Sequence, residues 1–175
     1  PVAFAFTQRY PERIHSLVIM NTWAWPLQPY WGFPLFSRLM SGRSGQWLTG
    51  YANAFSQILV WLAVYHKQAF SGRVHAHYRK PYQRPADRVA QVAMPYYLTG
   101  ASGWFQALYE QVGLLAAKPT ALVWGLRDPA FRPVFLKNWQ RLMPSAETFP
   151  LGRAGHFPQE DQPKAVVAAV RAVTA

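Results

Sequence analysis

Residues 119–131 read PTALVWGLRDPAF and give the clearest indication of the fold. Pro119 to Gly125 is a short, unbroken apolar run, which is typical of a strand buried on both faces of a parallel sheet. Asp128 follows this predicted strand directly. It would therefore lie in the crevice at the carboxyl end of the strand, where open α/β sheets bind ligands. The stretch predicts an α/β layer with a polar residue placed where a functional site is expected.

Two further runs predict neighbours for this strand. Ile14 to Met20 (IHSLVIM) is apolar and β-branched, and Glu147 to Leu151 forms a shorter run. Helices are predicted around them, at Val2 to Tyr10, Pro133 to Met143 and Pro163 to Val173. Strands that alternate with helices in this way are typical of a doubly wound parallel sheet.

A long middle region interrupts this alternation. Roughly Trp23 to Ala117 is rich in Trp, Tyr, Phe, Pro and Gly, with helical stretches near Gly45 to His66 and Asp87 to Leu98. This pattern favours a helical insertion over a continuing sheet. The sequence thus predicts an α/β core made of residues 1–22 and 118–175, split by a helical cap at residues 23–117.

The composition limits the class of protein. With 175 residues and 51% hydrophobic content, the chain is long enough for one domain with a real core. Its formal charge of +11 could indicate a nucleic-acid or anionic-membrane partner. The basic residues are scattered singly, however, and no nucleic-acid-binding motif occurs, so we expect no nucleic-acid partner. The absence of cysteine excludes disulfides and thiolate metal sites.

Membrane insertion and export are not expected. The most apolar run, Ile58 to Tyr65, falls well short of the roughly 20 residues that span a bilayer. The opening stretch PVAFAFTQRYPERIH lacks the basic and apolar regions of a signal peptide. We therefore expect no transmembrane segment and a cytoplasmic location.

Asp128 and His156 are the candidates for chemistry. Taken alone, Asp128 before a proline is more simply a turn former or helix N-cap, and a lone His156 is more often structural or exposed. Both, however, follow predicted strands, and a strand-end Asp followed by a strand-end Gly-His resembles the acid-then-base order of α/β-hydrolases. His156 would take a proton from a nucleophile or water, while Asp128 fixes its tautomer and stabilises the imidazolium. We expect the carboxylate to approach the imidazole to within about 3.5 Å.

A nucleophile is not evident in the sequence. No G-x-S-x-G motif occurs, and the opening PVAFAFTQRYPERIHSLVIMN looks like the helix that leaves a nucleophile turn together with the next strand. The nucleophile is therefore expected a few residues before Pro1. His75 and His77 form an H-x-H pair, but no carboxylate cluster lies near them, so we expect no metal site. His15 and His66 have no catalytic context.

Four stretches resemble one family: RYPERIHSLVIMNTWAWP, HYRKPYQRPADRVAQVAMPYYL, LAAKPTALVWGLRDPAFRP and GHFPQED. They are similar to the haloalkane dehalogenases, especially their third subfamily, and to the related β-lactone decarboxylases of olefin biosynthesis. The resemblance implies the C-terminal part of an α/β-hydrolase sheet with an inserted helical cap. It implies no cofactor and an aspartate nucleophile, whose alkyl ester is hydrolysed by His-activated water. Asp128 and His156 match the acid and base, because Asn21, where some members carry the acid, is not a carboxylic acid.

Aromatic residues near these positions could line an apolar substrate pocket. The candidates are Trp23, Trp25, Phe131 and Phe157, although isolated aromatics more often belong to a core. Eight tryptophans and nine tyrosines suit a small apolar substrate as the partner.

Rival interpretations remain, and the first is a β-lactone decarboxylase or an epoxide hydrolase that uses the same aspartate nucleophile. An epoxide hydrolase would use cap tyrosines; Tyr96 and Tyr97 are candidates, but their adjacency should place them on different helix faces. A non-catalytic interaction protein could instead use Ile58 to Tyr65 to lie on a membrane surface.

Overall fold

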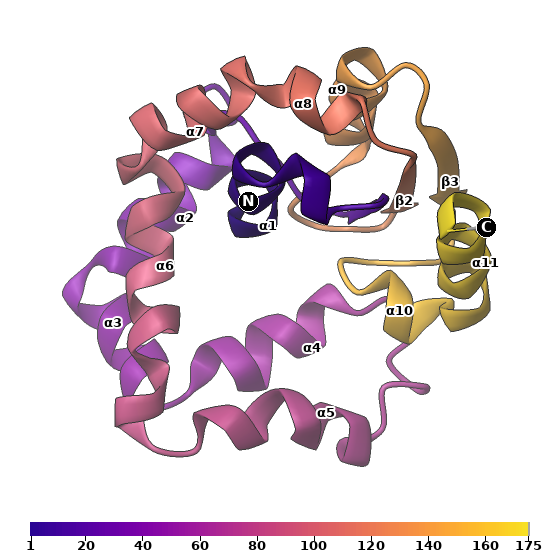
Figure 1. The fold of residues 1–175 in the computed structure, drawn as a ribbon. Helices are drawn as coiled ribbons and strands as arrows, with labels where there is room; N and C mark the ends of the chain where they lie inside the picture. Colours follow the sequence, from indigo (N-terminus) through magenta and orange to yellow (C-terminus); the bar gives the residue numbers. More distant parts are fainter. Residues whose placement is uncertain (175) are drawn as a thin grey trace. The chain divides into compact units, whose positions relative to one another are not determined.

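The structure is a computed structural model that describes residues 1–174. Contacts divide the chain into two compact units (Figure 1). The first comprises Pro1–Ala24, Ala63–Ala69 and Ala107–Ala175, and the second comprises Trp25–Leu62 and Phe70–Gln106. This division groups residues 63–69 and 107–117, which were expected in the helical insertion, with the unit that holds the sheet.

The first unit is built on a parallel sheet with the strand order β1-β2-β3. Its strands are β1 (Leu17–Met20), β2 (Thr120–Gly125) and β3 (Glu147–Leu151). Leu17 pairs with Thr120, and Gly125 pairs with Leu151. Because the strands are parallel, the residues that follow each of them meet at one edge of the sheet. The three predicted strands are confirmed, although β1 begins at Leu17, three residues later than expected.

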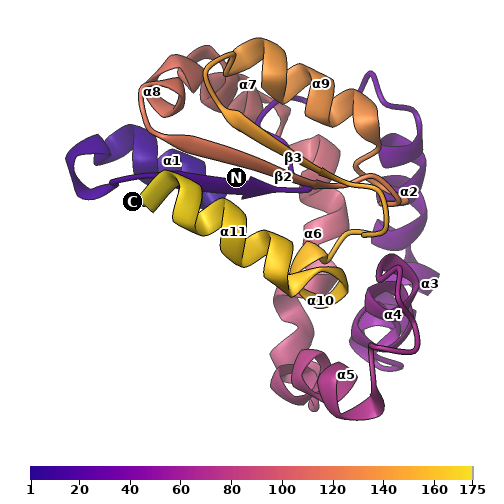
Figure 2. The ribbon, with the colours of Figure 1, turned by 90° about the vertical axis from the view of Figure 1, so that its right-hand side faces the viewer.

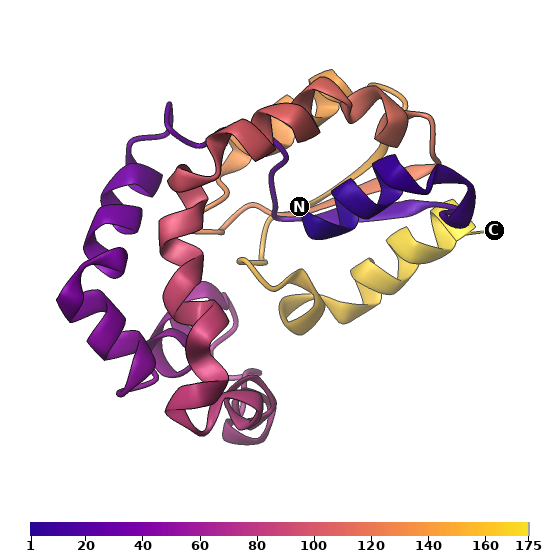
Figure 3. The same ribbon diagram turned by 60° about the vertical axis from the view of Figure 1, so that its left-hand side comes forward.

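Helices cover both faces of this sheet. Figures 2 and 3 show α8 and α9 on one face and α11 on the other, with α1 beside the strands. The bounds are α1 (Val2–Arg9), α8 (Val112–Ala116), α9 (Pro133–Leu142), α10 (Pro158–Asp161) and α11 (Pro163–Thr174), with a 3-10 turn at Pro11–Arg13. The three helices predicted for this unit are therefore present.

Strand β2 is the centre of the core, and all six of its residues are buried. Since side chains alternate along a strand, Ala121 and Val123 share one face and pack with Ala169 and Val173 of α11. Across the unit, the Phe4 ring of α1 lies 5.2 Å from the Trp139 ring of α9. Full burial of a large apolar side chain contributes about 1.5–3 kcal/mol, so this layer supplies much of the stability of the first unit.

The second unit contains helices, and no strand falls among its described residues. Its elements are α2 (Gly32–Ser41), α3 (Arg43–Gly50), a π-helix (Phe55–Leu59), most of α4 (Val60–Ala63), α5 (Gly72–Arg79), 3-10 turns at Lys80–Tyr82 and Pro85–Arg88, α6 (Val89–Gly100) and the start of α7 (Ser102–Glu110). Helix α2 packs against α6 and α3.

The helical region expected near Gly45 to His66 is present, but it is divided into several elements. Helix α3 ends at Gly50, and the chain resumes as a π-helix after a break. Asn53 lies in this break with φ of 53°, a left-handed conformation that no helix interior accommodates. Asn adopts this conformation more readily than most residues. Here its side chain donates to the distant Tyr82 carbonyl at 3.2 Å, which holds the break in place.

A buried arginine holds the second unit together. Arg88 is 6% exposed, and its guanidinium donates to the carbonyl oxygens of Gly50, Tyr51, Tyr82 and Gln83. The first two of these carbonyls lie at the end of α3, where the helix dipole favours a cation. Four backbone acceptors therefore offset the cost of burying this charge.

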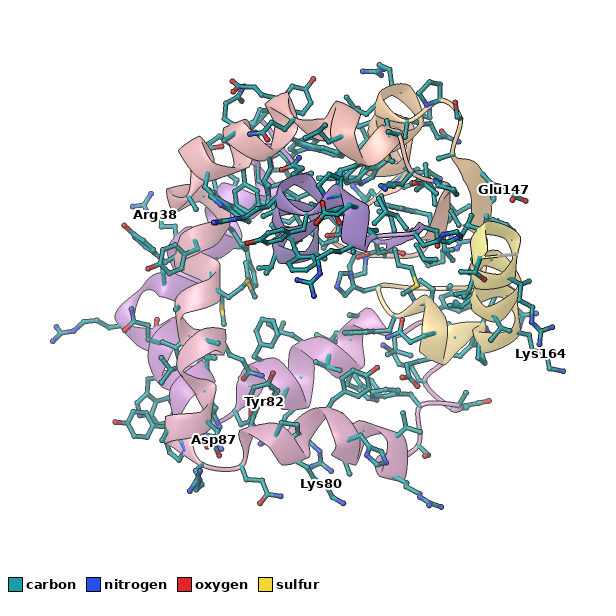
Figure 4. All side chains as sticks on the ribbon, in the orientation of Figure 1. Arg38, Lys80, Tyr82, Asp87, Glu147 and Lys164 are labelled. Atoms are coloured by element: carbon teal, nitrogen blue, oxygen red, sulfur yellow. The ribbon has the colours of Figure 1, made fainter. Side chains whose placement is uncertain are left out.

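Other basic side chains are dispersed. Figure 4 shows Arg38 on α2, Lys80 after α5 and Lys164 on α11, each projecting away from its own element.

No helix among residues 1–174 is long and apolar enough to cross a membrane.

Candidate active site

Asp128 lies buried just beyond the end of β2, and 3% of its surface is exposed. One carboxylate oxygen, Oδ1, accepts the Ala130 N–H at 2.7 Å, which makes Asp128 the turn former that its position before a proline indicates. The other, Oδ2, accepts from the Asn21 side chain at 2.8 Å and lies 2.7 Å from Nδ1 of His156. Asp128 is therefore a turn former through Oδ1, and the catalytic role predicted for it would use Oδ2.

His156 approaches this carboxylate from the loop after β3. The 2.7 Å separation between Nδ1 and Asp128 Oδ2 confirms the expected approach of the two side chains. A carboxylate only accepts hydrogen bonds, so this contact places a proton on Nδ1. Nε2 is then the nitrogen that can take up a proton. The side chain is 31% exposed, whereas that of Asp128 is fully buried, which suits a base held by a buried acid.

Asn21 is a site residue whose role the sequence did not reveal. It follows β1, is 3% exposed and has φ of 34°. Besides donating to Asp128, its Nδ2 donates to the Gly125 carbonyl at 3.1 Å, and its Oδ1 accepts the Gly125 N–H at 2.8 Å. Asn21 therefore fastens the end of β2 and orients the acid at the same time.

Two glycines allow the loops of this edge to approach closely. A Cβ on Gly125 would lie 1.9 Å from the Gly155 carbonyl oxygen, and a Cβ on Gly155 would lie 2.2 Å from the Ala63 carbonyl oxygen. Both distances are shorter than any non-bonded contact permits. The Arg127 N–H also donates to the Ala154 carbonyl at 2.9 Å. The absence of a side chain at these two positions thus brings the acid loop, the base loop and residue 63 together.

Aromatic rings surround the imidazole. The Phe131 ring stacks on His156 with centroids 5.5 Å apart, and on its other side Trp23 stacks on Phe131 at 5.1 Å. Phe157 meets the imidazole edge to face at 5.0 Å. Phe131 is only 5% exposed, and its ring also meets that of Phe135 edge to face at 5.2 Å. Trp25 is buried in the second unit. The pocket-lining roles of these four residues remain predictions.

A separate open cavity of about 430 Å³ lies within the second unit. Tyr96 and Tyr97 both border it, with ring centroids 5.2 Å apart in an edge-to-face arrangement. Their neighbouring positions on α6 therefore do not prevent both rings from reaching one cavity, and the expectation that they lie on different helix faces stays a prediction. Among residues 1–174, no group of three His, Asp or Glu side chains gathers as a metal site requires. His75 instead lies with Nε2 2.8 Å from the Ser56 carbonyl oxygen.

Comparisons with known proteins agree with this architecture. A family model described as the alpha/beta hydrolase fold matches residues 1–163. The chain is 32% identical over 172 residues to haloalkane dehalogenase 2 of Mycobacterium tuberculosis, covering 97% of this chain and 59% of that protein. It is 30% identical over 181 residues to cis-3-alkyl-4-alkyloxetan-2-one decarboxylase of Xanthomonas campestris pv. campestris, covering 98% and 58% respectively.

A solved structure shows the same fold. The haloalkane dehalogenase DbeA from Bradyrhizobium elkani superimposes with a TM-score of 0.81 at 23% identity, covering 96% of this chain and 61% of that one. The chain thus spans about 60% of the length of the relatives that it matches. With a family match over residues 1–163 and a parallel sheet that carries a hydrogen-bonded Asp–His pair at its carboxyl edge, the chain belongs to the α/β-hydrolase fold family.

Proposed function

We propose that this chain is the C-terminal part of a hydrolase of the haloalkane dehalogenase type, with Asp128 as its acid and His156 as its base. The observation that carries the proposal is the buried Asp128 carboxylate, 2.7 Å from Nδ1 of His156. The similarity to haloalkane dehalogenase 2 over 97% of the chain supports the reaction type.

The proposed reaction has two steps. An aspartate from the remainder of the protein attacks the carbon that bears the halogen, and halide leaves with the bonding electron pair. Water then hydrolyses the resulting ester while Nε2 of His156 takes its proton. Asp128 keeps the imidazole in the required tautomer and stabilises the imidazolium. No step needs a cofactor, and this chain alone would be inactive because it supplies no nucleophile.

The second unit would act as the cap over a small apolar substrate. Trp23, Trp25, Phe131 and Phe157 are the proposed lining residues, since aromatic side chains are common in pockets for apolar ligands. The cytoplasmic location expected from the sequence belongs to the same proposal.

A β-lactone decarboxylase is the second candidate. The similarity to the Xanthomonas oxetanone decarboxylase, 30% identity over 98% of the chain, favours it almost as strongly. An epoxide hydrolase would instead need Tyr96 or Tyr97 as ring-opening donors.

The test uses the full-length protein that contains this chain, incubated with 1-bromobutane and followed by intact-protein mass spectrometry. His156→Ala should gain the mass of a butyl group and retain it, because displacement at carbon needs no base whereas ester hydrolysis does. His15→Ala, the matched control, should turn the substrate over. A His156→Ala protein without covalent mass gain, beside an active unmodified enzyme, would contradict the division of roles. Alkene release from a cis-3-alkyl-4-alkyloxetan-2-one, with 1-bromobutane untouched, would favour the decarboxylase.

A further inference from the structure

We infer that Asp161 is a positioning residue for the candidate base, because its carboxylate fastens the His156 loop to the segment Ala63–Ala69. Its Oδ1 accepts the His66 N–H at 2.7 Å, and its Oδ2 accepts the Gly155 N–H at 2.8 Å. The Tyr65 N–H lies 3.1 Å from both oxygens. Three backbone donors from two distant segments thus converge on one carboxylate, here called the Asp161 clamp.

Local sequence explains how Asp161 reaches this position. The proline at 158 begins the short helix α10 directly after Phe157, and Asp161 is the last residue of that helix. The Asp161 N–H donates back to the Phe157 carbonyl at 3.2 Å. This single turn carries the carboxylate back beside Gly155, six residues earlier in the chain. The base therefore lies inside a loop whose two ends are joined by the clamp.

The opposite side of the loop is held by the same segment. The His156 N–H donates to the Ala63 carbonyl at 2.9 Å, and Gly155 has no room for a side chain against that carbonyl. Residues 63–69 are the stretch of the first unit that separates the two stretches of the second unit in the chain. The clamp therefore fixes the backbone around His156. It also fixes residues 63–69, where the chain leaves the second unit and later returns to it.

The chemistry of the clamp favours a carboxylate. Each of its partners is an N–H donor, and an ionised carboxylate accepts on both oxygens with bonds stronger than those of a neutral acceptor. An amide would present its own NH₂ group to one of these donors. A charged group near Asp161, Lys67, is consistent with a carboxylate at this position. Its Nζ contacts the Val64 carbonyl. Burial lowers the pKa of Lys67, and the charge of Asp161 partly offsets that lowering.

A purely structural role for Asp161 would stabilise α10 and leave His156 unaffected. The distinguishing readout is therefore the imidazole itself, and the inference rests on the role proposed for His156. The variant is Asp161→Asn, in this chain. Its control is Asp87→Asn, because Asp87 also accepts a backbone N–H, that of Arg84 at 3.1 Å, but in the second unit.

Two nuclear magnetic resonance measurements test the clamp. In Asp161→Asn we expect hydrogen exchange of the Tyr65, His66 and Gly155 amides to quicken at least tenfold. We also expect the Nδ1 proton of His156, hydrogen-bonded to Asp128, to exchange at least tenfold faster than in the unmodified chain. Asp87→Asn should change neither rate.

Loss of amide protection with an unchanged His156 Nδ1 proton would overturn the positioning role. If Asp161→Asn fails to fold, hydrogen exchange in the unmodified chain tests the clamp instead. The Tyr65, His66 and Gly155 amides should then be protected from exchange. In mildly denaturing urea they should become exchangeable together with the Nδ1 proton of His156. Unprotected amides there would refute the clamp. If the unmodified chain shows no hydrogen-bonded Nδ1 proton, the acid–base pairing itself fails, while the amide rates still decide whether the clamp exists.

Discussion

Replacing Asn21 by alanine should destabilise the first unit by at least about 3.5 kcal/mol. The change leaves the buried Gly125 N–H without its acceptor, which costs about 1–3 kcal/mol, and removes a donor from the Asp128 carboxylate, whose bond is worth about 1.5–3 kcal/mol. The φ of 34° adds to the loss, because a left-handed alanine is strained by about 1–2 kcal/mol. Asn21→Gly, which tolerates that conformation, should lose correspondingly less.

Urea unfolding followed by tryptophan fluorescence would measure this loss, since Trp124 and Trp139 of the same unit are fully buried. The free energy of unfolding falls by about 1–3 kcal/mol for each molar of urea. The urea concentration at the midpoint of unfolding should therefore be lower for Asn21→Ala by at least about 1 M. Gln140→Ala removes an exposed amide from the same unit and should stay within about 0.5 kcal/mol of the unmodified chain. An Asn21→Ala midpoint equal to that of Gln140→Ala would refute the idea that Asn21 fastens the acid loop.

Three other substitutions or conditions test the fold of the two units, each by itself. Gly155→Ala should cost about 1–3 kcal/mol because its Cβ would meet a backbone oxygen at 2.2 Å, whereas Gly152→Ala, with nothing within 4 Å, should be nearly neutral in thermal unfolding. Arg88→Met should lower the free energy of unfolding of the second unit by about 3 kcal/mol, because four backbone carbonyls lose a charged donor. The Asp87 pKa is lowered from 3.8, chiefly by the hydrogen bond from the Arg84 side chain. Its contribution to stability should therefore be complete above 3.8 and disappear as pH falls through the lowered value, which a carboxyl NMR titration would follow.

The sheet was predictable because its signal is local. An unbroken apolar run with a polar residue at its end needs no knowledge of distant residues, and β2 falls where such a run predicts it. The same holds for Asp128, whose place after β2 is a property of one short stretch. The break within the helical region near Gly45 to His66 could not be predicted, for the opposite reason. Its break depends on Asn53, which adopts a left-handed φ while its side chain bonds a carbonyl 29 residues away.

Asn21 and Asp161 could not be found from the sequence because each acts through distant partners. Asn21 bonds a strand end 104 residues away, and Asp161 bonds the His66 N–H 95 residues away. The local signals were only that Asn21 follows an apolar strand and that Gly155 precedes the candidate base. Such a glycine indicates that another backbone comes close, without saying which one. An acid–base pair can therefore be recognised from two strand ends, whereas the residues that hold the pair in place become visible only once the distant loops are brought together.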